Sequence, residues 1–158
     1  MGMHCDQCEQ TAKGTACTIA GVCGKSADVA ALQDLLIHAV KGLSLYATEA
    51  RRHGIVDQEI NGFTVQAVFS TVTNVDFDPE RFKPMIDRAV QLRERLKEKV
   101  AGAGGTVNFP DPAASFQPAG DLAGLIKQGD PEDLIVDQTA GADIQSLQRI
   151  LVYGLNLS

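Results

Sequence analysis

The most regular pattern of apolar positions lies between residues 26 and 54. Apolar side chains recur there at three- and four-residue steps, namely Val29, Leu32, Leu36, Ala39 or Val40, and Leu43. Such steps place the side chains on one face of an α-helix. Ser26 or Asp28 supplies an N-cap, and Arg51, Arg52 and Gly54 are typical of a helix C-terminus. The sequence therefore predicts an amphipathic helix that packs against a core.

Two further helices are predicted before residue 102. The second follows Asp57 and carries its apolar stripe on Ile60, Phe63, Ala67, Val68 and Thr71. Its β-branched residues also permit a strand, which stays open as the less favoured alternative. The third begins at Asp78-Pro79, a cap followed by proline at the first helical position. Pro84 lacks a backbone donor, so it is expected near the first turn or at a bend. The charged residues from Arg88 to Lys99 are expected to form a solvated face.

The last third of the chain divides into a linker and a second helical region. Residues 102–120 contain seven Gly or Pro, which predicts a linker between two packed units. A short apolar helix is expected over 122–127, and an amphipathic stretch runs from Asp143 to the end. The expected regions are a loop over 1–25, a bundle over 26–101, a linker over 102–120, and the start of a second bundle over 121–158.

The final stretch repeats the first helix. With Ala27 placed against Ala142, identical residues pair as Asp28 with Asp143, Leu32 with Leu147, Gln33 with Gln148, and Leu36 with Leu151. Two unrelated helices with a similar pattern remain the less favoured alternative. A real repeat implies that the chain is a fragment, which starts a second bundle and stops within its first long helix. The stripe Ile144, Leu147, Ile150, Leu151 and Leu155 must then pack on the first bundle, pair with another chain, or fray.

Composition and charge narrow the class of protein. Apolar residues make up 44% of the 158 residues and charged residues 22%, which is typical of a globular protein. Aromatic residues reach only 5%, without Trp, so a core of Leu, Val, Ile and Ala favours an all-α fold. The net charge of −6 and the lack of a basic run argue against nucleic-acid or anionic-membrane binding. No apolar stretch reaches the length of a membrane span or a signal peptide, so a cytoplasmic location is expected.

All four cysteines fall within the first 25 residues, as Cys5, Cys8, Cys17 and Cys23. Their spacing is C-x2-C-x8-C-x5-C, and all four fit one metal centre. An iron–sulfur cluster is favoured because it tolerates wide, uneven spacing. A structural zinc site is the second choice, because such sites usually have only two to four residues within each cysteine pair, whereas five residues separate Cys17 from Cys23. Disulfides or free thiols come last, because the chain looks intracellular. Spacing alone leaves all three open.

The residues between the cysteines favour a cluster. Small and hydroxyl residues let the backbone turn closely and aim donors at sulfur, namely Thr11, Gly14, Thr15, Thr18, Gly21 and Gly24. Lys13 and Lys25 are expected to be ordinary surface lysines, with a role as counter-charges the alternative. His4 lies next to Cys5, but four thiolates are available, so it is not expected to be a ligand.

The cysteine region resembles a known family. The run Cys5-Asp-Gln-Cys-Glu-Gln-Thr11, followed by Gly14, Cys17 and Gly21-Val-Cys-Gly-Lys25, resembles the N-terminus of the hybrid cluster proteins. These are also called prismane proteins or hydroxylamine reductases. The resemblance continues through residues 32–36 and 69–74 to the final repeat, so it covers essentially the whole chain. Met1-Gly2 looks like an added leader against the family pattern, and Asn156-Leu157-Ser158 departs from it at the other end.

The resemblance implies an N-terminal helical domain of two three-helix bundles, with an up-down first bundle after the cysteine loop. It implies that Cys5, Cys8, Cys17 and Cys23 bind a [4Fe–4S] cluster that passes electrons toward a hybrid Fe–S–O cluster. In the family that second cluster reduces hydroxylamine or nitric oxide, and its ligands come from later domains. The chain alone is therefore expected to hold no catalytic residue and no hybrid cluster.

The implied partners are an electron donor and the family's C-terminal domains, with self-association through residues 143–155 a further expectation. A zinc-stapled helical interaction module remains the alternative function.

Overall fold

The computed structural model describes residues 3–129, 134 and 139–157, apart from the side chains of 153 and 155–157. Within these residues, five α-helices follow one another as α1 (Ala27–Arg52), α2 (Gln58–Ser70), α3 (Pro79–Gly102), α4 (Leu122–Gly129) and α5 (Ala142–Leu157). Two short 3₁₀ turns lie at Ala12–Gly14 (η1) and Pro112–Ser115 (η2). The described residues contain no β-strand, so the prediction of an all-helical fold is confirmed.

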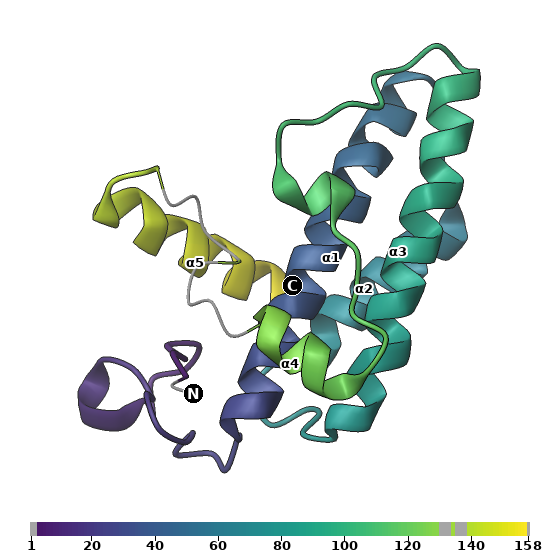
Figure 1. Cartoon of the computed structure of the whole chain (residues 1–158). Helices are drawn as coiled ribbons and strands as arrows, with labels where there is room; N and C mark the ends of the chain where they lie inside the picture. Colours follow the sequence, from purple (N-terminus) through teal and green to yellow (C-terminus); the bar gives the residue numbers. More distant parts are fainter. Residues whose placement is uncertain (1–2, 130–133, 135–138, 158) are drawn as a thin grey trace.

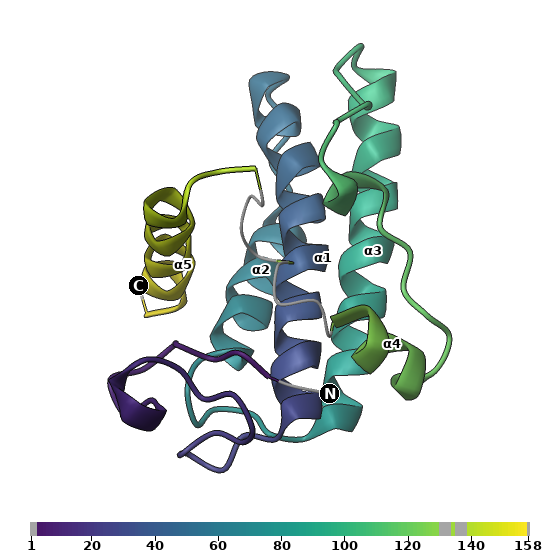
Figure 2. The same cartoon turned by 60° about the vertical axis from the view of Figure 1, so that its left-hand side comes forward.

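The core lies along α1, which packs lengthwise against α3 and also contacts α2, α4 and η2 (Figures 1 and 2). Leu32, Leu35, Leu36 and Leu43 of α1 are fully buried in this core. Burying such a side chain stabilises the fold by about 1.5–3 kcal/mol. Ser26 caps the helix, because its hydroxyl accepts a hydrogen bond from the Val29 N–H at 3.2 Å. The first predicted helix is therefore confirmed together with its apolar face.

Helix α2 settles the choice between helix and strand. Asp57 caps it by accepting hydrogen bonds from the N–H groups of Glu59 and Ile60, at 3.1 and 3.4 Å. The helix buries only a narrow stripe, and the β-branched Val65 is largely exposed. The strand alternative is wrong, because Gln58–Ser70 form a capped α-helix and the described residues contain no strand for this segment to pair with.

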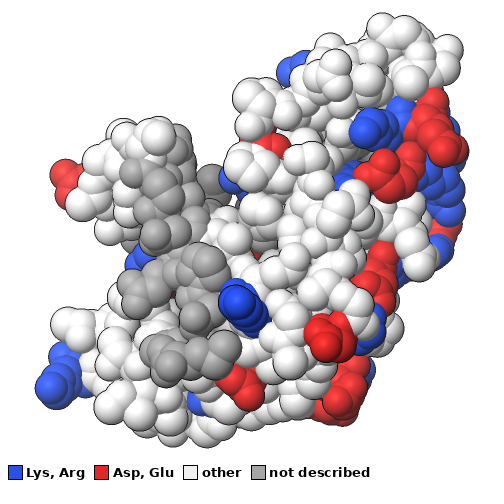
Figure 3. Space-filling model, viewed as in Figure 1, with Lys and Arg blue, Asp and Glu red and all other residues white. Residues whose placement is uncertain are grey.

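The charged residues of α3 form ion pairs with the start of α2. Arg95 contacts both Asp57 and Glu59, Lys99 contacts Asp57, and Arg88 contacts Glu59. Figure 3 shows acidic and basic side chains mixed along the side of the molecule that α3 forms. This fits the expected solvated face except at Arg93, which is fully buried, so the prediction is wrong for that residue. Such partly exposed pairs add little stability each, about 0–1 kcal/mol.

Residues 102–120 pack on the bundle. Ala113 and Ala114 of η2 are buried, and the fully buried Arg93 of α3 donates a hydrogen bond to the Ala113 carbonyl at 3.1 Å. On α1, a Cβ atom at Gly42 would lie 2.1 Å from the same carbonyl oxygen. This close approach of two backbones requires glycine. The segment expected to be a linker therefore contributes to the core.

Helix α5 lies apart from the α1–α3 core and contacts α2 (Figure 2). Ile144, Leu147, Ile150 and Leu151 are 53%, 64%, 67% and 63% exposed, and the side chain of Leu155 lies outside the described part. The apolar stripe thus has no cover among the residues described. None of the described helices combines the length and the apolar character needed to cross a membrane.

Candidate metal centre

The cysteine loop, residues 3–25, is held together by backbone hydrogen bonds and packs on α1 through Met3 and Cys17. The N–H of Cys5 donates to the Cys17 carbonyl at 3.1 Å, and the N–H of Cys17 donates back to the Cys5 carbonyl at 2.9 Å. Met3 donates to the Thr18 carbonyl at 3.2 Å, and Met3 and Cys17 pack on Ala30 of α1. The first and third cysteines are therefore held side by side against the helix.

Glycines shape the loop where the sequence suggested. Gly14 and Gly24 have φ angles of +69° and +92°, which side chains other than glycine rarely adopt. A Cβ atom at Gly21 would lie 3.1 Å from Cys23 Sγ and 3.0 Å from Lys25 Cβ. Gly21 therefore lets the backbone pass close to a cysteine sulfur. The Thr15 hydroxyl, by contrast, donates to the Ala12 carbonyl, although a hydroxyl aimed at sulfur was expected.

Cys5 and Cys17, which pair through their backbones, have thiol pKa values that are shifted in opposite directions. Hydrogen bonds from the N–H groups of Val22 and Ala12 lower the pKa of the Cys17 thiol, the second at 3.4 Å from the sulfur. Burial raises the pKa of the Cys5 thiol, and the nearby Lys25 ammonium only partly opposes this. Without a metal, Cys17 therefore forms a thiolate more readily than Cys5.

Lys25 is part of the site. Its side chain is 3% exposed, and its Nζ lies 3.8 Å from Cys5 Sγ and 3.3 Å from Gln7 Oε1. The prediction of an ordinary surface lysine is therefore wrong for Lys25, while Lys13 is exposed as expected. A buried ammonium beside a thiol offsets negative charge that develops there.

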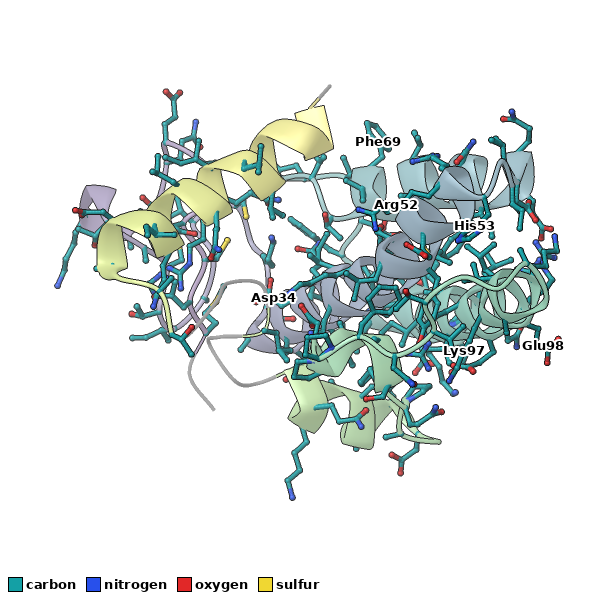
Figure 4. The ribbon with its side chains drawn as sticks, turned by 90° about the horizontal axis from the view of Figure 1, so that it is seen from above. Asp34, Arg52, His53, Phe69, Lys97 and Glu98 are labelled. Atoms are coloured by element: carbon teal, nitrogen blue, oxygen red, sulfur yellow. The ribbon has the colours of Figure 1, made fainter. Side chains whose placement is uncertain are left out.

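A small cavity of about 20 Å³, lined by both polar and apolar residues, lies beside Cys5. Its lining includes Lys25, Gln7 and Asp34 of α1, and it has room for about one water molecule. Burial raises the pKa of Asp34 to about 7, against the opposing charges of Lys25 and Arg149. Figure 4 places Asp34 on the side of α1 that faces α5 and the cysteine loop. Neither Gln7 nor Asp34 is marked as a site residue by a local sequence pattern.

The imidazole of His4 faces α5. Its Nε2 accepts a hydrogen bond from Arg149 Nη1 at 3.0 Å, and the same Arg149 atom lies 3.4 Å from Asp6 Oδ2. Asp6 lies between the first two cysteines in the sequence. A residue near the far end of the described chain therefore reaches the loop that carries the candidate ligands.

The donor chemistry of the loop fits a thiophilic metal group. Four free thiols lie in one loop, two N–H groups point at the Cys17 sulfur, and a buried ammonium lies beside Cys5. Among the residues that the structure describes, no three His, Cys, Asp or Glu side chains are gathered into a metal site. The backbone hydrogen bonds hold Cys5 and Cys17 side by side. To complete a four-sulfur shell, the parts of the loop that carry Cys8 and Cys23 must move toward these two cysteines.

Comparison with known proteins gives a consistent match. A family model described as the Prismane/CO dehydrogenase family matches residues 3–156. The chain is 54% identical to a hydroxylamine reductase of Syntrophobacter fumaroxidans, over 97% of this chain and 28% of that protein. It is 51% identical to a hydroxylamine reductase of Methanocella arvoryzae, over 97% and 28% of the two chains. A hydroxylamine reductase of Rhodospirillum rubrum is 46% identical over 97% and 29%. The chain thus spans less than a third of the length of these relatives.

Proposed function

Because the chain belongs to the Prismane/CO dehydrogenase family, we propose that it is the N-terminal electron-transfer region of a hydroxylamine reductase-like oxidoreductase. The observation that carries the proposal is a loop with four free cysteines, of which Cys5 and Cys17 pair through backbone hydrogen bonds. The proposed ligands are Cys5, Cys8, Cys17 and Cys23, and the proposed group is one [4Fe–4S] cluster. When bound, such a cluster takes up and releases single electrons.

The residues around the cysteines would control the charge on the site. The N–H groups of Ala12 and Val22 stabilise negative charge on Cys17, and Lys25 does the same beside Cys5. Hydrogen bonds and positive charge near sulfur favour the reduced, more negative state of an iron–sulfur centre. We therefore expect this environment to raise the reduction potential relative to a loop without these groups.

The loop also lies near the surface, as electron exchange with a donor requires. Ile19 and Val22, between the third and fourth cysteines, are 88% and 63% exposed. Cys8 and Cys23 are half-buried. We propose that an electron donor approaches this side, and that the electron leaves toward a second centre outside this chain.

The chain by itself is proposed not to reduce hydroxylamine. All four cysteines are assigned to one cluster, so no cysteine of the chain is left to ligate a second one. The relatives named hydroxylamine reductase are more than three times as long as the segment that aligns with this chain. Turnover of hydroxylamine by the metal-loaded chain, at a rate comparable to that of a full-length relative, would contradict this.

Metal analysis tests the proposed cluster directly. Chain reconstituted anaerobically with iron and sulfide should be brown and hold about four irons, and Cys8→Ser and Cys23→Ser should each lower that content. A colourless chain that excludes iron and binds one zinc instead would support the alternative, a zinc-stapled interaction module.

Two lysines of the same loop offer a matched test of the charge environment. Lys25→Gln removes the buried ammonium beside Cys5 and should lower the reduction potential of the reconstituted chain. Lys13→Gln removes an exposed ammonium and should change the potential much less, because water screens its charge. Equal shifts in the two variants would show that Lys25 has no special effect on the centre.

A further inference from the structure

Residues His4 to Gln7 connect the cysteine loop to two other parts of the molecule, the end of α2 and α5, and also pair with Cys17 within the loop. Gln7 reaches the end of α2, where its amide donates to the Thr71 carbonyl at 2.7 Å and accepts from the Thr73 hydroxyl at 3.0 Å. Cys5 pairs with Cys17 through the backbone. His4 and Asp6 contact α5 through one side chain, Arg149. These last two residues flank Cys5, so the group that holds them also restricts Cys5.

Arg149 is well placed to hold the loop. Its side chain is 19% exposed, and those of His4 and Asp6 are 30% and 28% exposed. Hydrogen bonds from a charged guanidinium are stronger than neutral ones, and partial burial reduces the screening of the ion pair by water. Arg149 is also the single basic residue in the sequence of α5. The opposite side of that helix carries the exposed apolar stripe, so Arg149 provides its polar attachment.

The repeat gives an independent reason to single out this position. Arg149 follows Ala142 at the same distance as Asp34 follows Ala27, so the two residues occupy equivalent positions of the repeat. One is basic and the other acidic, and the charge of Arg149 lowers the pKa of Asp34 against the effect of burial. Arg149 therefore favours the ionised form of Asp34, although burial keeps that carboxyl largely protonated below about pH 7.

We propose that Arg149 is a positioning residue that fastens α5 to the cysteine loop, so that metal loading of the loop and docking of α5 stabilise one another. The proposal rests on the proposed function only for the identity of the metal group. Coupling between two binding events is reciprocal, so a contact that helps the loop hold metal must also make α5 more stable when metal is bound. Loss of Arg149 removes both effects together.

Amide hydrogen exchange of the whole chain tests the proposal, with the metal-free protein and the protein reconstituted with iron and sulfide. Metal-free Arg149→Gln should exchange roughly tenfold faster than wild type at the amides of Cys5 and Cys17, the size expected for a lost charged hydrogen bond. Reconstitution should slow exchange in residues 143–152 of wild type and leave that of Arg149→Gln unchanged. Arg149→Lys should restore part of the effect, because it keeps the charge and loses the fork of donors.

Arg88→Gln is the matched control, because it removes an exposed arginine from the distant ion pair with Glu59 and should change neither region. Unchanged exchange at Cys5 in Arg149→Gln, or equal protection of α5 by metal in both proteins, would overturn the proposal. Loss of protection in α1 of Arg149→Gln would mean that this variant destabilises the whole fold. Asp6→Asn then serves as the test variant, because it weakens the same contact from the side of the loop. Failure to take up iron would refute the proposed cluster, while the metal-free comparison would still test the attachment.

Discussion

Helices α1 and α5 differ in what covers their apolar faces, although the repeat gives them the same pattern. Val29, Leu32, Leu35 and Leu36 of α1 are at most 2% exposed, whereas the equivalent residues Ile144, Leu147, Ile150 and Leu151 of α5 are 53–67% exposed. The cover of α1 comes from α2, α3, α4 and η2. The described part of the chain supplies no such cover for α5. An amphipathic pattern therefore specifies a helix with one apolar face, and other segments decide whether that face is buried.

The largest expected effect compares two leucines at equivalent positions. Leu36→Ala should lower the free energy of unfolding by about 2–5 kcal/mol, because it leaves a cavity in the core. Leu151→Ala should change it by less than about 0.5 kcal/mol, because that side chain is 63% exposed. Denaturant unfolding followed by circular dichroism at low protein concentration measures both.

Comparable losses in the two variants would mean that the α5 face is covered in solution. Self-association through residues 143–155 stays a prediction, and sedimentation over a range of concentrations tests it. A loss at Leu151 that grows with concentration would identify a second copy of the chain as the cover.

The next effect concerns the pH dependence of stability caused by Asp34, which occupies the position on α1 equivalent to Arg149 on α5. Burial raises the pKa of Asp34 from its ordinary 3.8 to about 7. Between these values the unfolded chain releases the proton while the folded chain keeps it, so this carboxyl makes stability fall as pH rises, with no further fall above pH 7. Asp34→Asn should remove this fall and be the more stable protein at pH 8, by up to a few kcal/mol at about 1.4 kcal/mol per pKa unit.

Unfolding midpoints of wild type and Asp34→Asn between pH 4 and 8 provide the measurement. Asp28→Asn is the control, because it removes an exposed carboxylate from the same helix. A difference between Asp34→Asn and wild type that stays constant over this range would show that Asp34 does not titrate as inferred.

The smallest effect compares two helical glycines. Gly42→Ala on α1 should cost about 1–3 kcal/mol, because its Cβ would overlap the Ala113 carbonyl. Gly154→Ala on α5 meets no atom of the described residues within 4 Å and should stabilise that helix by up to about 1 kcal/mol through helix propensity. Thermal unfolding and far-UV circular dichroism check both. A cost at Gly154 would reveal a close neighbour of α5 in solution.

Features that depend on neighbours in the sequence were predicted well. The caps at Ser26, Asp57 and Asp78 and the stripe of α1 are local, so they identify helices without knowledge of the fold. The choice between helix and strand for α2 was harder, because its buried stripe is narrow. Residues 102–120 were expected to be a linker because of their Gly and Pro content, and composition gave no hint that Gly42 admits the backbone at Ala113.

For the candidate site, the sequence identified the thiols and missed their surroundings. Spacing and resemblance pointed to the cysteines, because both are properties of one short segment. The contacts of Gln7 with Thr71 and of His4 with Arg149 join residues 64 and 145 positions apart, which no local pattern reveals. One indication was present in the sequence, since Asp34 is a charged residue inside the apolar run of α1.

The contact between His4 and Arg149 also sets an order of events during synthesis. The two residues are 145 positions apart, and a ribosome adds about 5–20 residues per second. The cysteine loop is therefore made roughly 7–30 s before the arginine that holds it. Throughout this interval the nascent loop has its cysteines but no attachment to α5. Iron and sulfide delivered then would enter a loop without this contact, and synthesis of α5 would then supply it.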